Sequence, residues 1–165
     1  MNTADRLIRA LGLKPHPKEG GYFAETYRSG ESVPAKALPK RYAGRRALST
    51  AIYYLLTPET LSPLHRLSSD EVYHFYIGDP VEVLLLGKKA RRMLLGPGIL
   101  TGERPQLLVP RGTWQGLRLK KGGSFALLGT TVAPGFEYAD YEHGDRAALV
   151  RAYPRQKAMI LALTK

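Results

Sequence analysis

Two residues with acid–base chemistry lie close together in one β-rich stretch of the sequence. His65 and Glu71 are both part of SPLHRLSSDEVYHFYIG, which runs from Ser62 to Gly78. An imidazole held by a carboxylate keeps one tautomer and titrates near neutral pH, so this pair can serve as a general acid or base. The same side chains can bind a divalent transition metal, which needs three or four nitrogen or oxygen ligands. A buried polar pair with a purely structural role is the third interpretation.

The alternation of side chains along a strand predicts which residues share a face with this pair. Residues i and i+2 point to the same side, so we expect Leu67 beside His65. By the same rule, Tyr73 and Phe75 lie on the face of Glu71. Tyr73 is therefore a candidate site residue beside Glu71, and Phe75 is a candidate ligand contact.

Further candidate ligand-binding residues lie outside this face or elsewhere in the chain. His74 has the opposite parity, so it is expected at an outer or dimer-facing surface unless a bulge turns it inward. Gln115 and Gln106 are the other polar residues expected to face the interior. Trp114 and Phe136 can stack on a ligand, or can simply fill the core. An apolar pocket with a few such polar groups suits a small polar ligand.

The middle of the chain has the pattern of an all-β protein. Between Ala47 and Val132, short β-rich runs alternate with turn residues at the spacing of a sandwich or barrel. No helix of useful length fits among them, which excludes parallel βαβ units. YFAETYRS, residues 22–29, also alternates like a half-buried strand. The strands are therefore expected to pair antiparallel.

Helices are expected only at the two ends of the chain. Asn2 or Thr3 is a suitable N-cap for a short amphipathic helix that stops at Gly12. Helical spacing returns after Gly144, and Pro154 can begin a final helix at its first position. No structure is predicted for the basic linker, residues 31–46.

Length and composition indicate one ordinary domain. We expect the 165 residues to form a single domain, with a β core at about 20–140 and a C-terminal helical segment at about 145–163. Hydrophobic residues make up 44% and charged residues 24% of the chain. The absence of cysteine excludes disulfides, zinc–thiolate sites and cysteine nucleophiles. No apolar run approaches the roughly 20 residues of a spanning helix, and no signal peptide is evident, so a cytoplasmic location is expected.

The net charge of +11 raises the question of a nucleic-acid partner. The basic residues, however, cluster in segments that read as solvated loops, with no helix of base-reading residues and no paired aromatic signature. These residues are Lys36, Lys40, Arg41, Arg45 and Arg46, and then Lys88, Lys89, Arg91 and Arg92. We therefore expect neither a nucleic acid nor a membrane as partner.

The stretch around His65 resembles the first signature of the cupin superfamily. That signature has two histidines two positions apart, then a glutamate, then a glycine that closes the strand. His65, Glu71 and Gly78 match the first histidine, the glutamate and the glycine, whereas Leu67 replaces the second histidine. The resemblance implies a double-stranded β-helix, the cupin jelly-roll barrel, with a short N-terminal helix and C-terminal helices.

The second cupin signature is also incomplete. Pro110 and Gly112 match it in VPRGTWQG, but Gln115 stands where its histidine is expected. Stretches between Pro15 and Gly144 further resemble the small uncharacterised cupins called cupin 5 or DUF985. Leu67 cannot ligate a metal, and an amide oxygen is a weaker ligand than imidazole. No cofactor is therefore expected, and a divalent transition metal on His65 and Glu71 is the alternative.

The resemblance implies a function based on a small ligand in the barrel. Metal-free cupins include deoxysugar epimerases, which use a histidine base and a tyrosine acid on a nucleotide-linked sugar, and Tyr73 or Tyr138 could fill the tyrosine role here. We expect binding of a small polar metabolite, a carbohydrate or nucleotide-linked sugar, with epimerase- or isomerase-like chemistry. A non-enzymatic ligand-sensing or structural cupin and a metal-dependent enzyme are the alternatives. Cupins of this kind usually pair through their sheets, so a homodimer is expected, which would cover the edge strand at residues 22–29.

Overall fold

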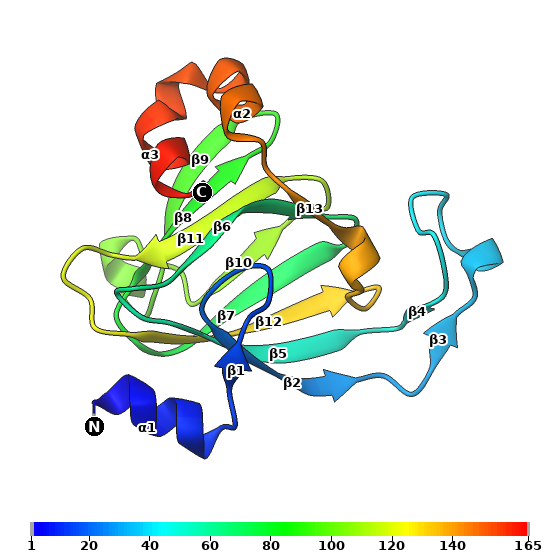
Figure 1. Cartoon of the computed structure of the whole chain (residues 1–165), viewed down its shortest axis with the longest axis horizontal. Coiled ribbons are helices and arrows are strands. Elements are labelled where there is room, and N and C mark those ends of the chain that lie inside the picture. Colours follow the sequence, from blue (N-terminus) through cyan, green and yellow to red (C-terminus); the bar gives the residue numbers. More distant parts are fainter. Residues whose placement is uncertain (1, 165) are drawn as a thin grey trace.

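Two antiparallel sheets enclose the core in the computed structural model, which describes residues 2–164 (Figure 1). The first sheet has the order β1 (Lys14–Pro15), β2 (Tyr22–Arg28), β5 (Thr50–Leu56), β12 (Ala126–Ala133), β7 (Asp70–Gly78) and β10 (Gln106–Val109). The second has the order β13 (Tyr141–His143), β6 (Leu61–Leu67), β11 (Trp114–Leu119), β8 (Val81–Leu86) and β9 (Ala90–Leu95). The predicted all-β, antiparallel architecture is confirmed.

The core lies between these sheets because each strand turns one set of alternate side chains inward. Tyr54 and Leu56 of β5 pack with Tyr73 of β7 from the first sheet, and with Val83 and Leu117 from the second. All five are at most 2% exposed. Burying a large apolar side chain contributes about 1.5–3 kcal/mol, so this layer holds the sheets together.

The N-terminal helix α1 (Thr3–Ala10) forms as the capping residues predict. The Asn2 side chain accepts a hydrogen bond from the backbone N–H of Asp5 at 2.8 Å, and Gly12 has a positive φ of 62° just beyond the helix. The apolar face of α1 packs on Leu55 and Leu127, which point outward from the first sheet. The helix therefore covers the sheet from outside and leaves the barrel interior free.

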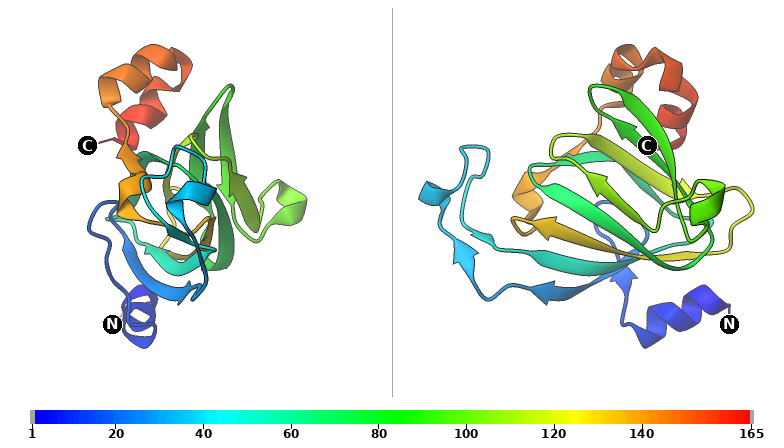
Figure 2. Two further views of the ribbon diagram at one scale, coloured as in Figure 1. Left: turned by 90° about the vertical axis from the view of Figure 1, so that its right-hand side faces the viewer. Right: turned by 180° about the vertical axis from the view of Figure 1, so that it is seen from behind.

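Two short helices, α2 (Arg146–Ala152) and α3 (Lys157–Ala162), cover the outer face of the second sheet (Figure 2). Pro154 begins a 3-10 turn, Pro154–Gln156, which leads into α3. Leu149, Ile160 and Leu163 of this segment pack on Leu64 of β6. The C-terminal prediction is therefore confirmed, with a 3-10 turn as the first turn of the last helix.

The basic linker is more ordered than the sequence suggests. It forms an arm that projects from the barrel, in which β3 (Ser32–Val33) pairs with β4 (Arg46–Ala47) and a 3-10 turn spans Ala35–Ala37 (Figure 1). Arg46 is only 3% exposed and donates two hydrogen bonds to Asp140, at 2.6 and 2.7 Å. The expectation of a solvated loop is therefore wrong for Arg46, because a carboxylate distant in sequence binds it.

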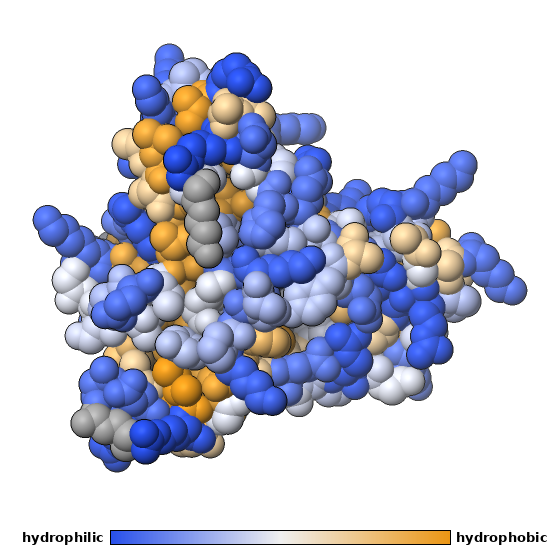
Figure 3. Space-filling model, in the orientation of Figure 1, coloured by the Kyte–Doolittle hydropathy of each residue, from blue (hydrophilic) through white to orange (hydrophobic). Residues whose placement is uncertain are grey.

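The surface of the described chain is mainly polar. In Figure 3, hydrophilic residues cover most of the visible face, and apolar residues gather beside the terminal helices. Within residues 2–164, no helix is long and apolar enough to cross a membrane.

Candidate functional site

A cavity of about 240 Å³ lies against the inner face of the first sheet. Strands β2, β5, β7 and β12 supply most of its wall, and Leu67 of β6, the turn before β2 and the loop after β12 supply the rest. The lining residues are His16, Glu19, Phe23, Glu25, Arg28, Thr50, Ile52, Tyr54, Leu67, Glu71, Tyr73, Thr130, Val132, Phe136, Glu137 and Tyr138. Of the nine predicted site residues, this cavity brings together Glu71, Tyr73 and Phe136.

Glu71 is the predicted catalytic residue that lines the cavity with a carboxyl group. It is 6% exposed, and its Oε2 accepts a hydrogen bond from Gln115 Nε2 at 2.7 Å. Burial, followed by the nearby charge of Glu19, raises the pKa of Glu71 to about 7, although His65, Gln115 and Thr130 oppose the shift. A carboxyl group with this pKa is present in both protonation states at neutral pH. It can therefore accept or donate a proton in the cavity.

His65 lies behind the cavity wall and is 1% exposed. Its Nδ1 is 2.8 Å from the carbonyl oxygen of Pro63, which can only accept, so Nδ1 carries the proton and Nε2 carries the lone pair. Nε2 is 3.8 Å from Glu19 Oε1. Burial lowers the pKa of His65, which keeps the ring neutral at pH 7. His65 therefore does not line the cavity itself, and it contacts the lining residue Glu19.

Glu19 is the functional candidate that the sequence interpretation missed. Its side chain is 14% exposed and lines the cavity, where Oε2 accepts a hydrogen bond from Ser62 Oγ at 3.3 Å. Its Oε1 lies 3.9 Å from His16 Nε2 and 3.8 Å from His65 Nε2. Burial raises the pKa of Glu19. The cavity thus contains a second buried carboxyl group next to two imidazoles.

A tight turn holds Glu19 in this position. Gly20 and Gly21 have φ values of 78° and 68°, which favour glycine. A Cβ atom at either position would be 2.8 Å from a backbone oxygen, that of Leu61 or of Leu55. The glycine pair is visible in the sequence as a turn signal, and the acidic residue that precedes it was the available signal for the site.

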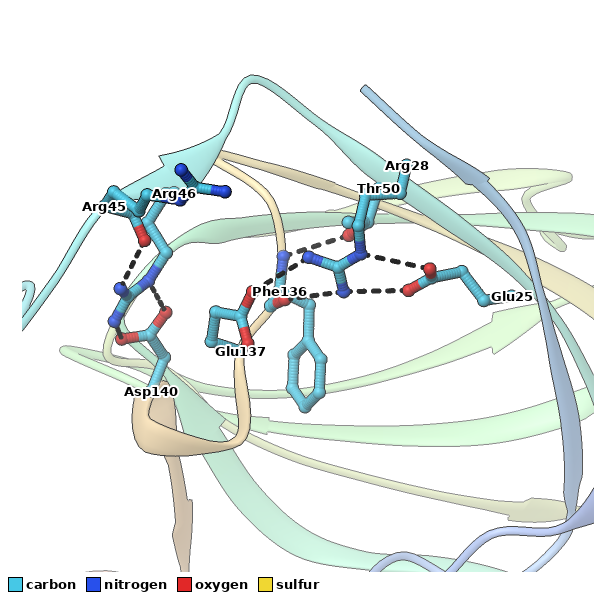
Figure 4. A network of polar contacts seen from close by, with 8 residues as sticks. All are labelled: Glu25, Arg28, Arg45, Arg46, Thr50, Phe136, Glu137 and Asp140. Carbon is cyan, nitrogen blue, oxygen red and sulfur yellow. Dashed lines mark hydrogen bonds and ion pairs between the residues drawn. The ribbon is translucent and has the colours of Figure 1, made fainter. Parts of the chain in front are cut away.

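Arg28 closes the rim of the cavity on the other side (Figure 4). Its guanidinium donates to both carboxylate oxygens of Glu25, at 3.0 and 2.9 Å, and to Glu137 Oε1 at 2.8 Å. It also donates to the carbonyl oxygen of Phe136 at 3.2 Å. Tyr138 packs edge-on against the Phe136 ring, with centroids 5.1 Å apart. Ion pairs of Arg28 therefore connect β2 to the loop after β12 at the rim.

The model of a protein family described as "Cupin superfamily (DUF985)" matches residues 5–144 of the chain. This chain belongs to that family. An uncharacterized protein of Saccharomyces cerevisiae is 30% identical to this cupin over 158 residues, which cover 85% of this chain and 74% of that protein. Two solved structures are also similar. A hypothetical protein from Leishmania major is 34% identical, with a TM-score of 0.87 and 99% of each chain covered. A protein from Shewanella oneidensis is 33% identical, with a TM-score of 0.86, and the match covers 100% of this cupin and 99% of that chain.

Cupins often bind a metal, but the side chains of this cupin do not fit a histidine-rich metal centre. Leu67 lines the cavity at one expected ligand position. At the other, Gln115 uses its amide N–H to bind Glu71, and its Oε1 is buried without a hydrogen-bond partner. Across residues 2–164, no group of three or more histidine, cysteine, aspartate or glutamate residues is arranged to hold a metal ion.

Trp114 and Phe75 are candidate ligand contacts that the structure does not place among the lining residues of this cavity. Trp114 packs against the apolar cluster beneath the C-terminal helices, and the guanidinium of Arg66 lies 4.4 Å from its ring centroid. Phe75 packs against the main core. Both aromatic residues therefore pack within the protein. Trp114 lies in the cluster outside the barrel, and Phe75 lies against the core inside it.

Gln106 and His74 face away from the cavity. They are opposite each other in the register of β10 and β7, and Gln106 Nε2 lies 3.3 Å from His74 Nδ1. His74 Nε2 is 3.0 Å from Thr131 Oγ1. The side chain of His74 faces outward, as its parity predicts. Gln106 does not face the interior as expected, because Leu107 and Val109 are the buried, inward-facing residues of β10 and Gln106 alternates with them.

Proposed function

We propose that this cupin binds a small polar metabolite in the cavity and transfers a proton to and from it. The observation that carries the proposal is Glu71, a cavity carboxyl group whose pKa is about 7. General acid–base catalysis works best when the pKa lies near the operating pH. A proton removed from the substrate would pass to the Glu71 carboxylate and return from it, as an epimerase or isomerase requires.

The neighbouring side chains suit distinct tasks in this reaction. Tyr73 lines the same cavity, and burial raises its pKa, so it remains a neutral phenol that can donate a hydrogen bond. Gln115 orients Glu71 through its N–H. His65 acts as a positioning residue, because it meets Glu19 and not the cavity.

The cavity volume limits what the ligand can be. Pockets for drug-sized ligands have volumes of roughly 300–1,000 Å³. At about 240 Å³, the cavity suits a group of monosaccharide size. If the substrate is a nucleotide-linked sugar, the sugar would lie inside and the nucleotide would extend past the rim at Arg28.

The test is exchange of substrate hydrogen with solvent. Free ketoses and nucleotide-linked keto sugars are incubated with the protein in D₂O, and deuterium in the recovered sugar is measured by mass spectrometry. We expect incorporation with the wild type, none with Glu71→Gln, and full incorporation with the exposed control Glu59→Gln. Incorporation that survives Glu71→Gln would exclude the proposed role of Glu71. Binding without incorporation by any variant would favour the second candidate, a non-enzymatic ligand sensor, which the missing histidines at Leu67 and Gln115 support.

A homodimer is the assembly that we propose. Strand β1 pairs with β2 only at Tyr22 and Phe23, so within residues 2–164 no strand covers the outer edge of β2 from Ala24 to Arg28. Tyr27, on this edge, is 54% exposed. Unpaired edges are usually covered by another chain or by charge. Light scattering at micromolar concentration should give twice the chain mass of 18.3 kDa, and a monomer mass would contradict the proposal.

A further inference from the structure

The cavity has a charge opposite to that of the chain as a whole. The chain carries a net charge of +11. Its cavity nevertheless presents four carboxyl groups and a single guanidinium. The carboxyl groups belong to Glu19, Glu25, Glu71 and Glu137, and the guanidinium belongs to Arg28. An acidic interior in a basic protein calls for a ligand that provides positive charge.

Arg28 does not neutralise the two inner carboxyl groups. Its guanidinium is occupied by the rim residues Glu25 and Glu137. Among residues 2–164, no lysine and no other arginine lines the cavity near Glu19 and Glu71. A buried carboxylate without a cationic partner is costly in free energy, which agrees with the raised pKa values of both groups.

The two imidazoles next to Glu19 do not provide the missing charge either. Burial lowers the pKa of His16 and of His65, so both rings are neutral at pH 7. His16 Nδ1 accepts the backbone N–H of Glu19 at 2.8 Å, which leaves its proton on Nε2. His65 Nε2 keeps a lone pair. The groups next to Glu19 and Glu71 are therefore neutral, and Gln115 Oε1, on the side chain that binds Glu71, is buried with no hydrogen-bond partner among the described residues.

Aromatic rings complete the wall around these groups. Phe23, Tyr54, Tyr73, Phe136 and Tyr138 all line the cavity. Ring faces attract cations, and the attraction is stronger when the pair is shielded from water. The rim already holds one ammonium group in this way, because exposed Lys18 places its Nζ 5.1 Å from the centroid of Tyr138.

We propose that the cavity selects a small metabolite that carries an ammonium group, with this group beside Glu19 and Glu71 and the rest of the ligand against the aromatic wall. An amino sugar has the right size and charge. A phosphorylated or carboxylated ligand would instead bring negative charge to four carboxyl groups. The inference rests on the proposed ligand cavity and narrows its substrate class. It also predicts that binding releases protons, because a cation favours the ionised form of Glu71.

The test compares ligands that differ only in charge, by calorimetry in the presence of EDTA. The first set is D-glucosamine, D-glucose and D-glucuronate, and the second is choline with its uncharged isostere 3,3-dimethylbutan-1-ol. We expect at least one cation to bind about tenfold or more tightly than its neutral partner, and no heat from glucuronate. Binding of the cation should tighten as the pH rises from about 6 to 8.

Variants assign the effect to the inner carboxyl groups. Glu19→Gln and Glu71→Gln should each weaken the cation by about tenfold or more, and exposed Glu59→Gln should leave it unchanged, with circular dichroism confirming that each variant is folded. Three results would overturn the inference: equal affinity for a neutral or anionic partner, no cation binding in either set, or cation binding that appears only when Mn²⁺ replaces EDTA.

This outcome can be separated from the proposed catalytic role. Deuterium incorporation that depends on Glu71, together with a preference for neutral or anionic sugars, would reject the cationic ligand and keep the catalysis. Selective cation binding without any incorporation would keep the ligand class and reject the proton transfer.

Discussion

Asp140 and Glu71 are equally buried acidic residues in different circumstances. Asp140 is 7% exposed, and both of its oxygens accept hydrogen bonds from the guanidinium of Arg46. Glu71 is 6% exposed and receives only neutral donors, with Gln115 the closest. Removing one partner of a buried ion pair is strongly destabilising, whereas a buried acid with a shifted pKa in a cavity is a candidate functional group. The first anchors the β3–β4 arm, and the second lies in the cavity.

The largest expected effect comes from breaking the compensated pair. Arg46→Ala leaves Asp140 buried without a partner, which should destabilise the protein by about 3–5 kcal/mol in urea unfolding. The control is Arg45→Ala, because Arg45 is exposed and contributes only its backbone carbonyl to Arg46, and it should stay within about 0.5 kcal/mol of the wild type. Equal losses in the two variants would mean that the pair does not anchor the arm.

The contribution of Glu71 to stability should instead depend on pH. The pKa of Glu71 rises on folding from 4.5 to about 7, so its contribution to stability is complete below pH 4.5 and is lost as the pH rises through 7. The full shift corresponds to about 3 kcal/mol. The glutamine of Glu71→Gln cannot ionise. The free energy of unfolding of this variant, relative to that of the wild type, should therefore increase by up to that amount between about pH 5 and 8. Parallel pH profiles from urea titrations would contradict this account.

A counter-ion can also be supplied to the cavity by design. Leu67→His combined with Gln115→His adds one imidazole on β6, the strand of His65, and one on β11, where Gln115 is the register partner of His65. We expect the double variant to bind Ni²⁺ or Mn²⁺, and to gain about 2.7 kcal/mol of stability at a hundredfold excess over Kd. The wild type, titrated in parallel, provides the baseline. A double variant that gains no metal-dependent stability would show that these positions do not converge.

The smallest effect on stability is expected at the rim. The Arg28 side chain is 37% exposed, so Arg28→Gln should lower the free energy of unfolding by less than about 1 kcal/mol. Arg66→Gln is the matched control, because Arg66 is 40% exposed and pairs with Glu142 away from the cavity. Only Arg28→Gln should alter the association rate of a cavity ligand in stopped-flow measurements. Identical association rates in both variants would show that the Arg28 ion pairs do not control ligand entry into the cavity.

Local sequence rules were sufficient for much of the fold. Strand alternation placed Glu71 and Tyr73 on the cavity face and His74 on the other, because side-chain parity is fixed by the backbone. Capping chemistry located the first helix at Asn2 for the same local reason. The family motifs added the pairing of distant strands, which local rules do not provide.

The remaining features depend on contacts between distant parts of the chain. Arg46 looked like one of several loop cations until Asp140 was brought to it by the fold. Glu19 precedes a glycine pair, and nothing near it in the sequence indicates that the fold brings it to His65. Trp114 was misplaced because the helices that cover it come from the far end of the chain.

The glycine pair behind Glu19 also constrains how ligand preference can diverge in descendants of this sequence. Any side chain at Gly20 or Gly21 would collide with backbone oxygen, so this side of the entrance tolerates little substitution. The opposite side is formed by the side chains of Phe136, Glu137 and Tyr138, which can change without moving that turn. New specificities are therefore expected to arise at the loop after β12, while the Glu19 side is inherited unchanged.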